Sequence, residues 1–181
     1  MAEPLDGQFC HLQVFWPRCP TGTRSAPPEL TVQILCGTDL IHIHRIEQAI
    51  IRQGESFLTR IFTTPERSYC TLPDGSFRYA SLAARFAAKE SIAKALGTGV
   101  GPEGIQWTDI EILTQTGGAP IARLHGAAKI RYETLGGLSL AISLTHDQDL
   151  AQAFCVLLSS GQAAPFSEDD STDRIARGVE R

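Results

Sequence analysis

The sequence predicts a single compact α+β domain, and three observations lead to that prediction. The 181 residues, of which 43% are apolar, are enough for one domain with a real hydrophobic core. A long helical segment, residues 78–96, lies in the middle of the chain. Near the end, residues 138–145 alternate between apolar and small polar side chains, as a half-buried strand does. Strands and helices mixed in this order are typical of α+β domains.

The first part of the domain combines a short strand with helices. Residues 32–36 are β-prone, and this strand is expected to stop at residues 37–39. The next segment has the period of an amphipathic helix that closes at Gly54. Its apolar and basic faces are formed by Ile43, Ile46 and Ile50 and by Arg45 and Arg52. A further helix is expected with Thr64 as its cap and Pro65 in its first turn.

The second part of the domain contains the long helix and the closing strands. Residues 73–75 break the chain before the helix of roughly 78–96, which Gly97 ends. The elements expected after it are a strand at 105–113, a turn at 117–120, a helix at 125–135 and two strands at 138–145 and 151–158. The last two strands are expected to pair through the polar connection 146–149.

Both ends of the chain differ from the domain in composition. Four prolines lie between positions 17 and 28, so residues 1–30 are predicted to be an irregular N-terminal extension. Residues 159–181 are polar and acidic and are predicted to form a disordered tail. The domain itself is therefore expected to span residues 31–158.

The charge distribution indicates a protein partner rather than nucleic acid. A formal net charge of −4 argues against a general nucleic-acid binder. Residues 45–94, however, carry eight basic side chains against five acidic ones. This locally basic, mostly helical surface could receive an acidic partner. A solvated charged helix face is the ordinary alternative.

The cysteines and the apolar segments indicate a cytoplasmic protein. The five cysteines are scattered and form no C-x-x-C pair, which fits reduced thiols better than disulfides or a zinc site. No apolar run approaches the roughly 18–20 residues of a membrane span. The N-terminus lacks the apolar core of a signal peptide.

Glu90 is the most informative residue of the long helix, because it lies on an apolar stripe between Phe86 and Ala93. A carboxylate there needs a cation, a metal or several hydrogen-bond donors. Lys94 lies one turn further on, within reach of Glu90. The helix alone leaves two interpretations open: a partly buried ion pair, or a metal carboxylate beside a cation that binds phosphate.

Two further residues are candidates by position. Asp39 stands between the first expected strand and the helix after it, where a carboxylate can either cap the helix or serve a functional site. Together with Glu90 it would offer oxygen ligands suited to Mg²⁺. His146, where a closing strand ends, could bind an anion, act as a base or cap the hairpin. By contrast, His42 and His44, placed on the first helix, have no third ligand at zinc spacing.

Several segments, taken in order, resemble the holo-acyl-carrier-protein synthases. The resemblance covers about residues 32–158 and includes the central helix of that family. The matching segments are GTDL (37–40), RI (45–46), FTTPE (62–66), RFAAKE (85–90), KALGTG (94–99), WTDIEI (107–112), GAP (118–120) and SLTH (143–146). The chain is on this basis identified as a member of the 4′-phosphopantetheinyl transferase family. The resemblance implies that family's fold, a mixed antiparallel sheet packed with a long central helix.

The resemblance also implies a reaction. Such enzymes transfer the phosphopantetheine arm of coenzyme A to a serine hydroxyl of acyl carrier protein and release adenosine 3′,5′-bisphosphate, in support of fatty-acid biosynthesis. Carried over, Asp39 and Glu90 would hold Mg²⁺, and Lys94 would neutralise phosphate or assist proton transfer. The residues implied in coenzyme A binding are Arg85, Lys94, Gly97, Gly118, Pro120 and His146, with Arg85 and His146 on the side of the 3′-phosphate.

The resemblance further implies partners. Arg45 and Arg52 would receive the acidic carrier protein, and the enzyme would be a homotrimer whose sites lie across subunit boundaries. No nucleic acid or membrane is expected to take part. Two alternatives stay open: the same chemistry on polyketide or peptide-synthetase carriers, and a binding module for coenzyme A or its carrier that has lost turnover.

Overall fold

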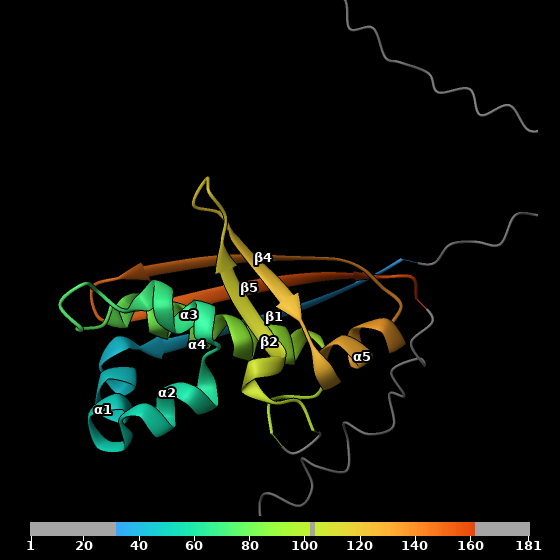
Figure 1. The fold of residues 1–181 in the computed structure, drawn as a ribbon. Helices are drawn as coiled ribbons and strands as arrows, with labels where there is room; N and C mark the ends of the chain where they lie inside the picture. Colours follow the sequence, from blue (N-terminus) through green and yellow to red (C-terminus); the bar gives the residue numbers. More distant parts are fainter. Residues whose placement is uncertain (1–31, 102–103, 162–181) are drawn as a thin grey trace, which may run out of the picture.

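The computed structural model describes residues 32–101 and 104–161, and shows an α+β arrangement in which helices cover one side of an antiparallel sheet (Figure 1). The N-terminal extension and the tail after residue 161, both predicted from composition, lie outside the described residues. The elements in chain order are β1 (Gln33–His42), α1 (Ile43–Gln53), α2 (Glu55–Ile61), α3 (Thr64–Cys70), α4 (Tyr79–Ala95), η1 (Trp107–Asp109), β2 (Ile110–Thr114), β3 (Pro120–Leu124), α5 (Gly126–Thr134), β4 (Gly137–Asp147) and β5 (Leu150–Ser159).

The main sheet has three antiparallel strands in the order β1-β5-β4, which confirms the predicted closing hairpin. The register pairs Asp39 of β1 with Ala153 of β5, and Ala151 with His146 of β4. Alternate residues of β5, among them Ala153 and Leu157, are buried on the side where α4 packs. Strands β2 and β3 form a separate two-stranded ribbon.

Helix α4 lies at the centre of the fold and is buried over most of its circumference. The expected limits of 78–96 agree with the observed Tyr79–Ala95, and Gly97, at a φ of 76°, follows its end. Small side chains such as Ala83, Ala87 and Ala88 are fully buried. Such residues allow a helix to approach neighbouring backbones closely, so α4 can pack against sheet and helices at once.

Strand β1 is longer than the sequence suggested. It was expected to stop at residues 37–39, but it continues through them to His42. Gly37 is therefore not a turn residue: a Cβ placed there would lie 1.9 Å from the backbone oxygen of Ser91 on α4. A glycine inside a strand often marks such a close backbone approach. The correction places Asp39 within the strand, and His42 ends the strand instead of lying on a helix.

Other elements begin or end within a few residues of their predicted boundaries. Thr63, not Thr64, caps α3, because the capping box joins Thr63 and Glu66. The strand expected at 105–113 begins only at Ile110, since a 3₁₀ turn precedes it. Helix α2 and strand β3 were not predicted at all. No helix among the described residues is both long and apolar enough to cross a membrane.

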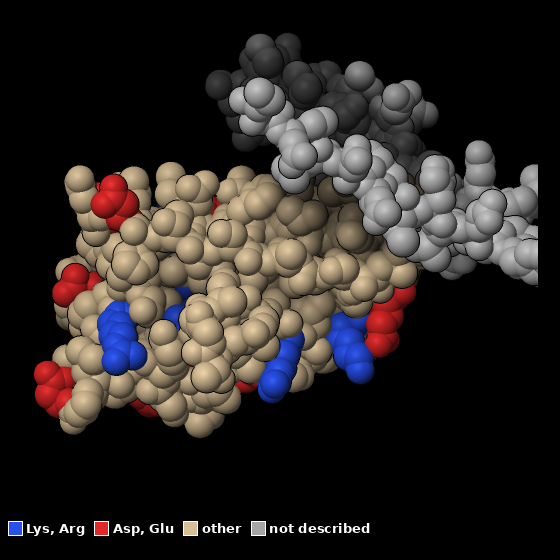
Figure 2. Space-filling model, turned by 90° about the horizontal axis from the view of Figure 1, so that it is seen from above, with Lys and Arg blue, Asp and Glu red and all other residues tan. Residues whose placement is uncertain are grey.

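The face of the sheet that points away from α4 carries exposed apolar side chains. Ile34, Leu40 and Phe154 are 71%, 57% and 46% exposed on strands β1 and β5. The register places them on one face together with the half-buried Val156 and Leu158. Figure 2 looks at the molecule from this side, and the middle of the view has neither acidic nor basic side chains.

Candidate functional site

Strand β1 and helix α4 bring together the three residues that the resemblance assigned to catalysis. The Lys94 Nζ donates to Asp39 Oδ1 at 2.8 Å and to the backbone oxygen of Thr38 at 2.9 Å. Glu90 lies one turn before Lys94 on α4. Asp39 and Glu90 are 51 positions apart in sequence, and the close approach of the two elements at Gly37 is what lets them meet.

The carboxyl group of Glu90 is held in an unfavourable environment for its charge. Burial raises its pKa above the ordinary value, and the nearby negative charge of Asp39 raises it further, while Lys94 acts in the opposite direction. Lys94 is ion-paired with Asp39 instead, and no ion pair is formed by Glu90 within 32–101 and 104–161. The interpretation of Glu90 and Lys94 as a simple ion pair is therefore not what the structure shows.

This environment fits a divalent cation. A carboxylate whose pKa is raised by burial and by a second carboxylate nearby, as that of Glu90 is, is stabilised by a positive charge between the two groups. No group of three or more His, Cys, Asp or Glu side chains suited to a metal occurs in the described part of the chain. A two-carboxylate site suits Mg²⁺, which keeps several waters and takes further oxygens from substrate phosphates.

A groove beside the acidic pair contains the two predicted docking arginines. It has a volume of about 410 Å³ and is lined by Ile41, His44, Arg45, Ile46, Gln48, Ala49, Arg52 and Phe86. Its apolar floor includes Ile41, which stands two residues after Asp39 on β1, and Phe86, one helical turn before Glu90. The groove therefore lies next to the candidate site on both elements, and Asp39, Glu90 and Lys94 are not among its lining residues. From the sequence, Phe86 is predicted to lie on the apolar stripe of the helix and is part of the matching segment RFAAKE, but its place in a groove is not predicted.

Arg85 does not face Asp39 and Glu90. It stands five residues before Glu90 on α4, and this separation places the two side chains on different sides of the helix. It is only 5% exposed, and it donates to Thr114 Oγ1 at 2.9 Å and to the Ser81 backbone oxygen at 3.2 Å. Its guanidinium also stacks on the Tyr69 ring, 4.3 Å from the centroid. Its Nε is buried without a hydrogen-bond partner.

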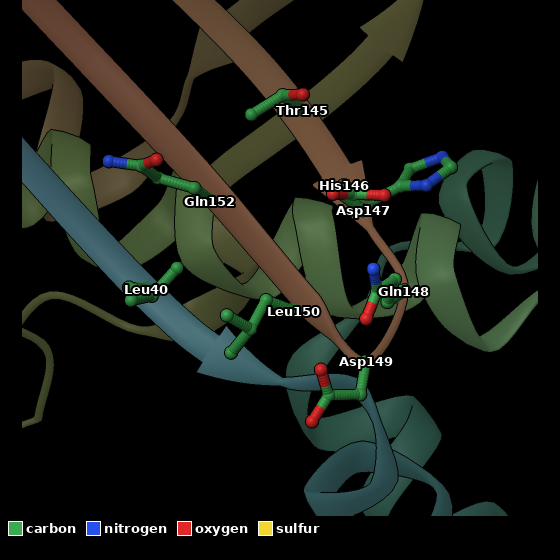
Figure 3. Close-up of a pocket in the computed structure, with 8 residues that line it drawn as sticks. All are labelled: Leu40, Thr145, His146, Asp147, Gln148, Asp149, Leu150 and Gln152. Atoms are coloured by element: carbon green, nitrogen blue, oxygen red, sulfur yellow. The ribbon is translucent and has the colours of Figure 1, made fainter.

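The other residues assigned to coenzyme A are dispersed in this single chain. Gly97 follows α4, whereas Gly118 and Pro120 lie at the turn of the β2–β3 ribbon, which projects from the body of the molecule (Figure 1). His146 lines a pocket of about 260 Å³ at the β4–β5 hairpin. Figure 3 shows its ring directed away from Leu40 and Gln152 in that pocket.

One buried ion pair was not anticipated. Lys89 and Glu66 are both fully buried, and the Nζ of Lys89 lies 2.9 Å from Glu66 Oε2. Burial lowers the pKa of Lys89, and the charge and hydrogen bond of Glu66 act against that shift. In the sequence these residues looked like parts of a cap and of a basic helix face, 23 positions apart. The sequence signal that could have drawn attention to Glu66 is its capping-box spacing from Thr63.

Comparison with known proteins identifies the family. The family model described as the 4′-phosphopantetheinyl transferase superfamily matches residues 35–155. The holo-[acyl-carrier-protein] synthase of Ruminiclostridium cellulolyticum is 41% identical over 126 residues, which cover 70% of this chain and 92% of that protein. The corresponding synthase of Herpetosiphon aurantiacus is 44% identical over 128 residues, with 68% and 97% covered.

Solved structures agree with the sequence relatives. The holo-[acyl-carrier-protein] synthase of Helicobacter pylori, in complex with coenzyme A, matches with a TM-score of 0.59 and 32% identity, covering 68% of this chain and 99% of that one. The synthase of Neisseria meningitidis gives a TM-score of 0.59 and 31% identity, with 68% and 96% covered. The chain belongs to the 4′-phosphopantetheinyl transferase superfamily and, within it, to the holo-[acyl-carrier-protein] synthases.

Proposed function

We propose that this protein transfers the 4′-phosphopantetheine group of coenzyme A to a serine of apo-acyl carrier protein, in support of fatty-acid biosynthesis in the cytoplasm. The observation that carries the proposal is the convergence of Asp39, Glu90 and Lys94 where β1 crosses α4. Phosphoryl-type transfer is achieved mainly by positioning and by neutralising charge, and this cluster supplies groups for both.

The reaction exchanges one phosphorus–oxygen bond for another. The serine hydroxyl of the carrier attacks the phosphorus that bears pantetheine, the pyrophosphate bond breaks, and adenosine 3′,5′-bisphosphate leaves. The serine proton passes to a carboxylate of the cluster or to a water that the carboxylate orients. Lys94, 48% exposed and already bound to Asp39, is positioned to neutralise a phosphate oxygen.

Asp39 and Glu90 are the residues that would hold Mg²⁺. The ion would supply neutralisation of the pyrophosphate charge during the transfer. A bound cation would offset the burial cost of the Glu90 charge and its repulsion from Asp39. Arg85, Gly97, Gly118, Pro120 and His146 are proposed to contact coenzyme A.

The groove of α1 is proposed to receive the carrier protein. Arg45 and Arg52 are exposed on its rim, and an acidic partner would meet them there. Its lining includes Ile41, two residues after Asp39 on β1, and Phe86, one turn before Glu90 on α4. A carrier docked in this groove would therefore present its serine close to the carboxylates.

The exposed apolar face of the sheet is proposed to be the subunit interface of a homotrimer. Ile34, Leu40 and Phe154 form a patch that a second copy of the chain would cover. The dispersal of Arg85, Pro120 and His146 in one chain supports a site built from two subunits. Such a site would draw the ribbon or the hairpin from one copy and the carboxylates from its neighbour.

The proposal is tested by incubating the protein with coenzyme A, Mg²⁺ and apo-acyl carrier protein, and by measuring the intact mass of the carrier. A mass gain of one phosphopantetheine group, absent when the acceptor serine of the carrier is alanine, is expected. The same mass measurement on apo-carrier proteins of polyketide and peptide synthetases shows which class of carrier the enzyme modifies. Coenzyme A binding without any mass gain on any carrier would contradict the proposal.

A further inference from the structure

The buried pair of Glu66 and Lys89 satisfies every polar atom it contains. Glu66 Oε1 accepts from the Ile112 backbone N–H at 2.9 Å, and Oε2 accepts from the Thr63 backbone N–H at 2.7 Å as well as from Lys89. Lys89 Nζ donates in addition to the backbone oxygens of Trp107 and Ile110. All three ammonium donors of Lys89 therefore have acceptors.

These bonds join four elements. Glu66 belongs to α3, Lys89 to α4, Trp107 to η1, and Ile110 and Ile112 to β2. Strand β2 pairs only with β3, so the ribbon has no ladder to the main sheet within the described residues. Its position relative to α4 therefore depends on side-chain contacts. Arg85 supplies one of them, to Thr114 at the end of β2, and Glu66 and Lys89 supply the fully buried ones at the start of the strand.

The pair is poorly explained as a source of stability alone. Replacing a buried ion pair by apolar side chains is often neutral or stabilising, because both charges must be removed from water. A buried polar network can instead fix one geometry, since its hydrogen bonds are directional. The geometry fixed here is the orientation of the ribbon, whose turn carries Gly118 and Pro120.

We infer that Glu66 and Lys89 are positioning residues for coenzyme A: they hold the β2–β3 ribbon in one orientation on α4. This inference rests on the proposed function, in which the ribbon turn and the α4 residues contribute to coenzyme A sites. Glu90 and Lys94 follow Lys89 on the same helix, so one rigid element links the ribbon to the carboxylate cluster. Loosening the ribbon should weaken coenzyme A binding and leave the carrier groove intact.

The test uses Glu66→Gln and Lys89→Met in the full chain, with Lys129→Met as the matched control. Lys129 is exposed and pairs at 3.8 Å with Glu133 on α5, a helix that takes no part in the hydrogen bonds of the network. The KM for coenzyme A is expected to rise about tenfold or more in both network variants, which corresponds to ~1.4 kcal/mol. The KM for the carrier is expected to stay within about twofold, as is every parameter of the control.

A purely structural role gives a different result. Partial unfolding lowers the active fraction, so kcat falls while both KM values stay at the wild-type level. Unchanged KM values for coenzyme A in folded Glu66→Gln and Lys89→Met overturn the inference. A wild-type protein that transfers nothing contradicts the proposed function instead, so the two failures are distinguishable.

A double variant, Glu66→Met with Lys89→Met, keeps the inference testable if a single variant is too unstable. It contains no uncompensated buried charge, so its urea midpoint should exceed that of Lys89→Met. Its KM for coenzyme A should nevertheless stay raised, because the backbone groups of Ile110 and Ile112 have lost their side-chain partners. A double variant with wild-type KM overturns the inference.

Discussion

At the scale of single residues, the ionisation of Glu90 makes the metal-free protein sensitive to pH. Its pKa in the folded state lies above the unfolded value, so the folded state binds more protons between the two values. Stability is therefore lost as the pH rises through the folded-state pKa. Glu90→Gln removes this loss, and it should stabilise the metal-free protein at pH 7 by no more than ~1 kcal/mol, because the site is partly exposed to screening solvent.

The measurement is urea unfolding in the presence of EDTA between pH 4.5 and 7. The difference between Glu90→Gln and the wild type should grow with pH over this range. Added Mg²⁺ should stabilise the wild type and leave Glu90→Gln unchanged. A constant difference across the range would mean that Glu90 ionises freely in the folded protein.

Single residues also show where sequence reasoning stops. The i, i+4 spacing of Glu90 and Lys94 predicted correctly that they share a helix face. It could not show that Lys94 pairs with Asp39, since that contact joins residues 55 positions apart. Arg85 stays a predicted coenzyme A residue, but its stacking on Tyr69 could not be predicted, because that contact depends on a neighbouring helix that local patterns do not place.

At the scale of elements, the approach of β1 to α4 depends on Gly37. Gly37→Ala places a methyl group 1.9 Å from the Ser91 backbone oxygen, so one element must move. We expect a loss of about 2 kcal/mol in the free energy of unfolding, as for other overpacked sites. Transfer activity should fall as well, because Asp39 and Glu90 would be moved apart.

The matched control is Gly117→Ala in the ribbon turn. A Cβ at Gly117 meets no atom within 4 Å, and its φ lies outside the left-handed region. Its free energy of unfolding, measured in urea, should equal that of the wild type within about 0.5 kcal/mol. If Gly37→Ala and Gly117→Ala have equal free energies of unfolding, the contact between β1 and α4 at Gly37 has room for a methyl group.

Helix α1 provides a second prediction at this scale. Arg45→Glu should raise the KM for acyl carrier protein about tenfold, since like charges would meet in the groove. The KM for coenzyme A should not change. Raising the salt concentration should increase the carrier KM of the wild type and have a smaller effect on the variant. A carrier KM insensitive to both charge reversal and salt would place docking on another surface.

The elements themselves were predictable to different degrees. Helix α4 and the β4–β5 hairpin have strong periodic patterns, and their limits were found within two residues. Strand β1 was cut short because Gly37 was interpreted as a turn, although a strand glycine can also mark a close contact. Strand β3 was missed because Pro120 and Arg123 weaken its pattern, and only pairing with β2 reveals it.

At the scale of the whole molecule, the outer sheet face predicts association. Phe154→Glu would place a charge in the centre of the proposed interface, so the variant should be monomeric where the wild type is a trimer. Light scattering coupled to size exclusion measures this directly. Glu133→Gln, on the exposed side of α5, serves as the control. A wild type that is monomeric at assay concentration would contradict the proposed trimer.

The most direct test of the catalytic proposal is the initial rate of phosphopantetheine transfer in Asp39→Asn and Glu90→Gln, compared with Glu133→Gln. Carrier modification is followed by intact mass at saturating coenzyme A and Mg²⁺. Because both carboxylates are proposed to hold the ion, each of the first two variants should lose roughly 100-fold or more in kcat, while the control keeps the wild-type rate. Wild-type rates in both carboxylate variants would show that the pair formed by β1 and α4 does not carry the reaction.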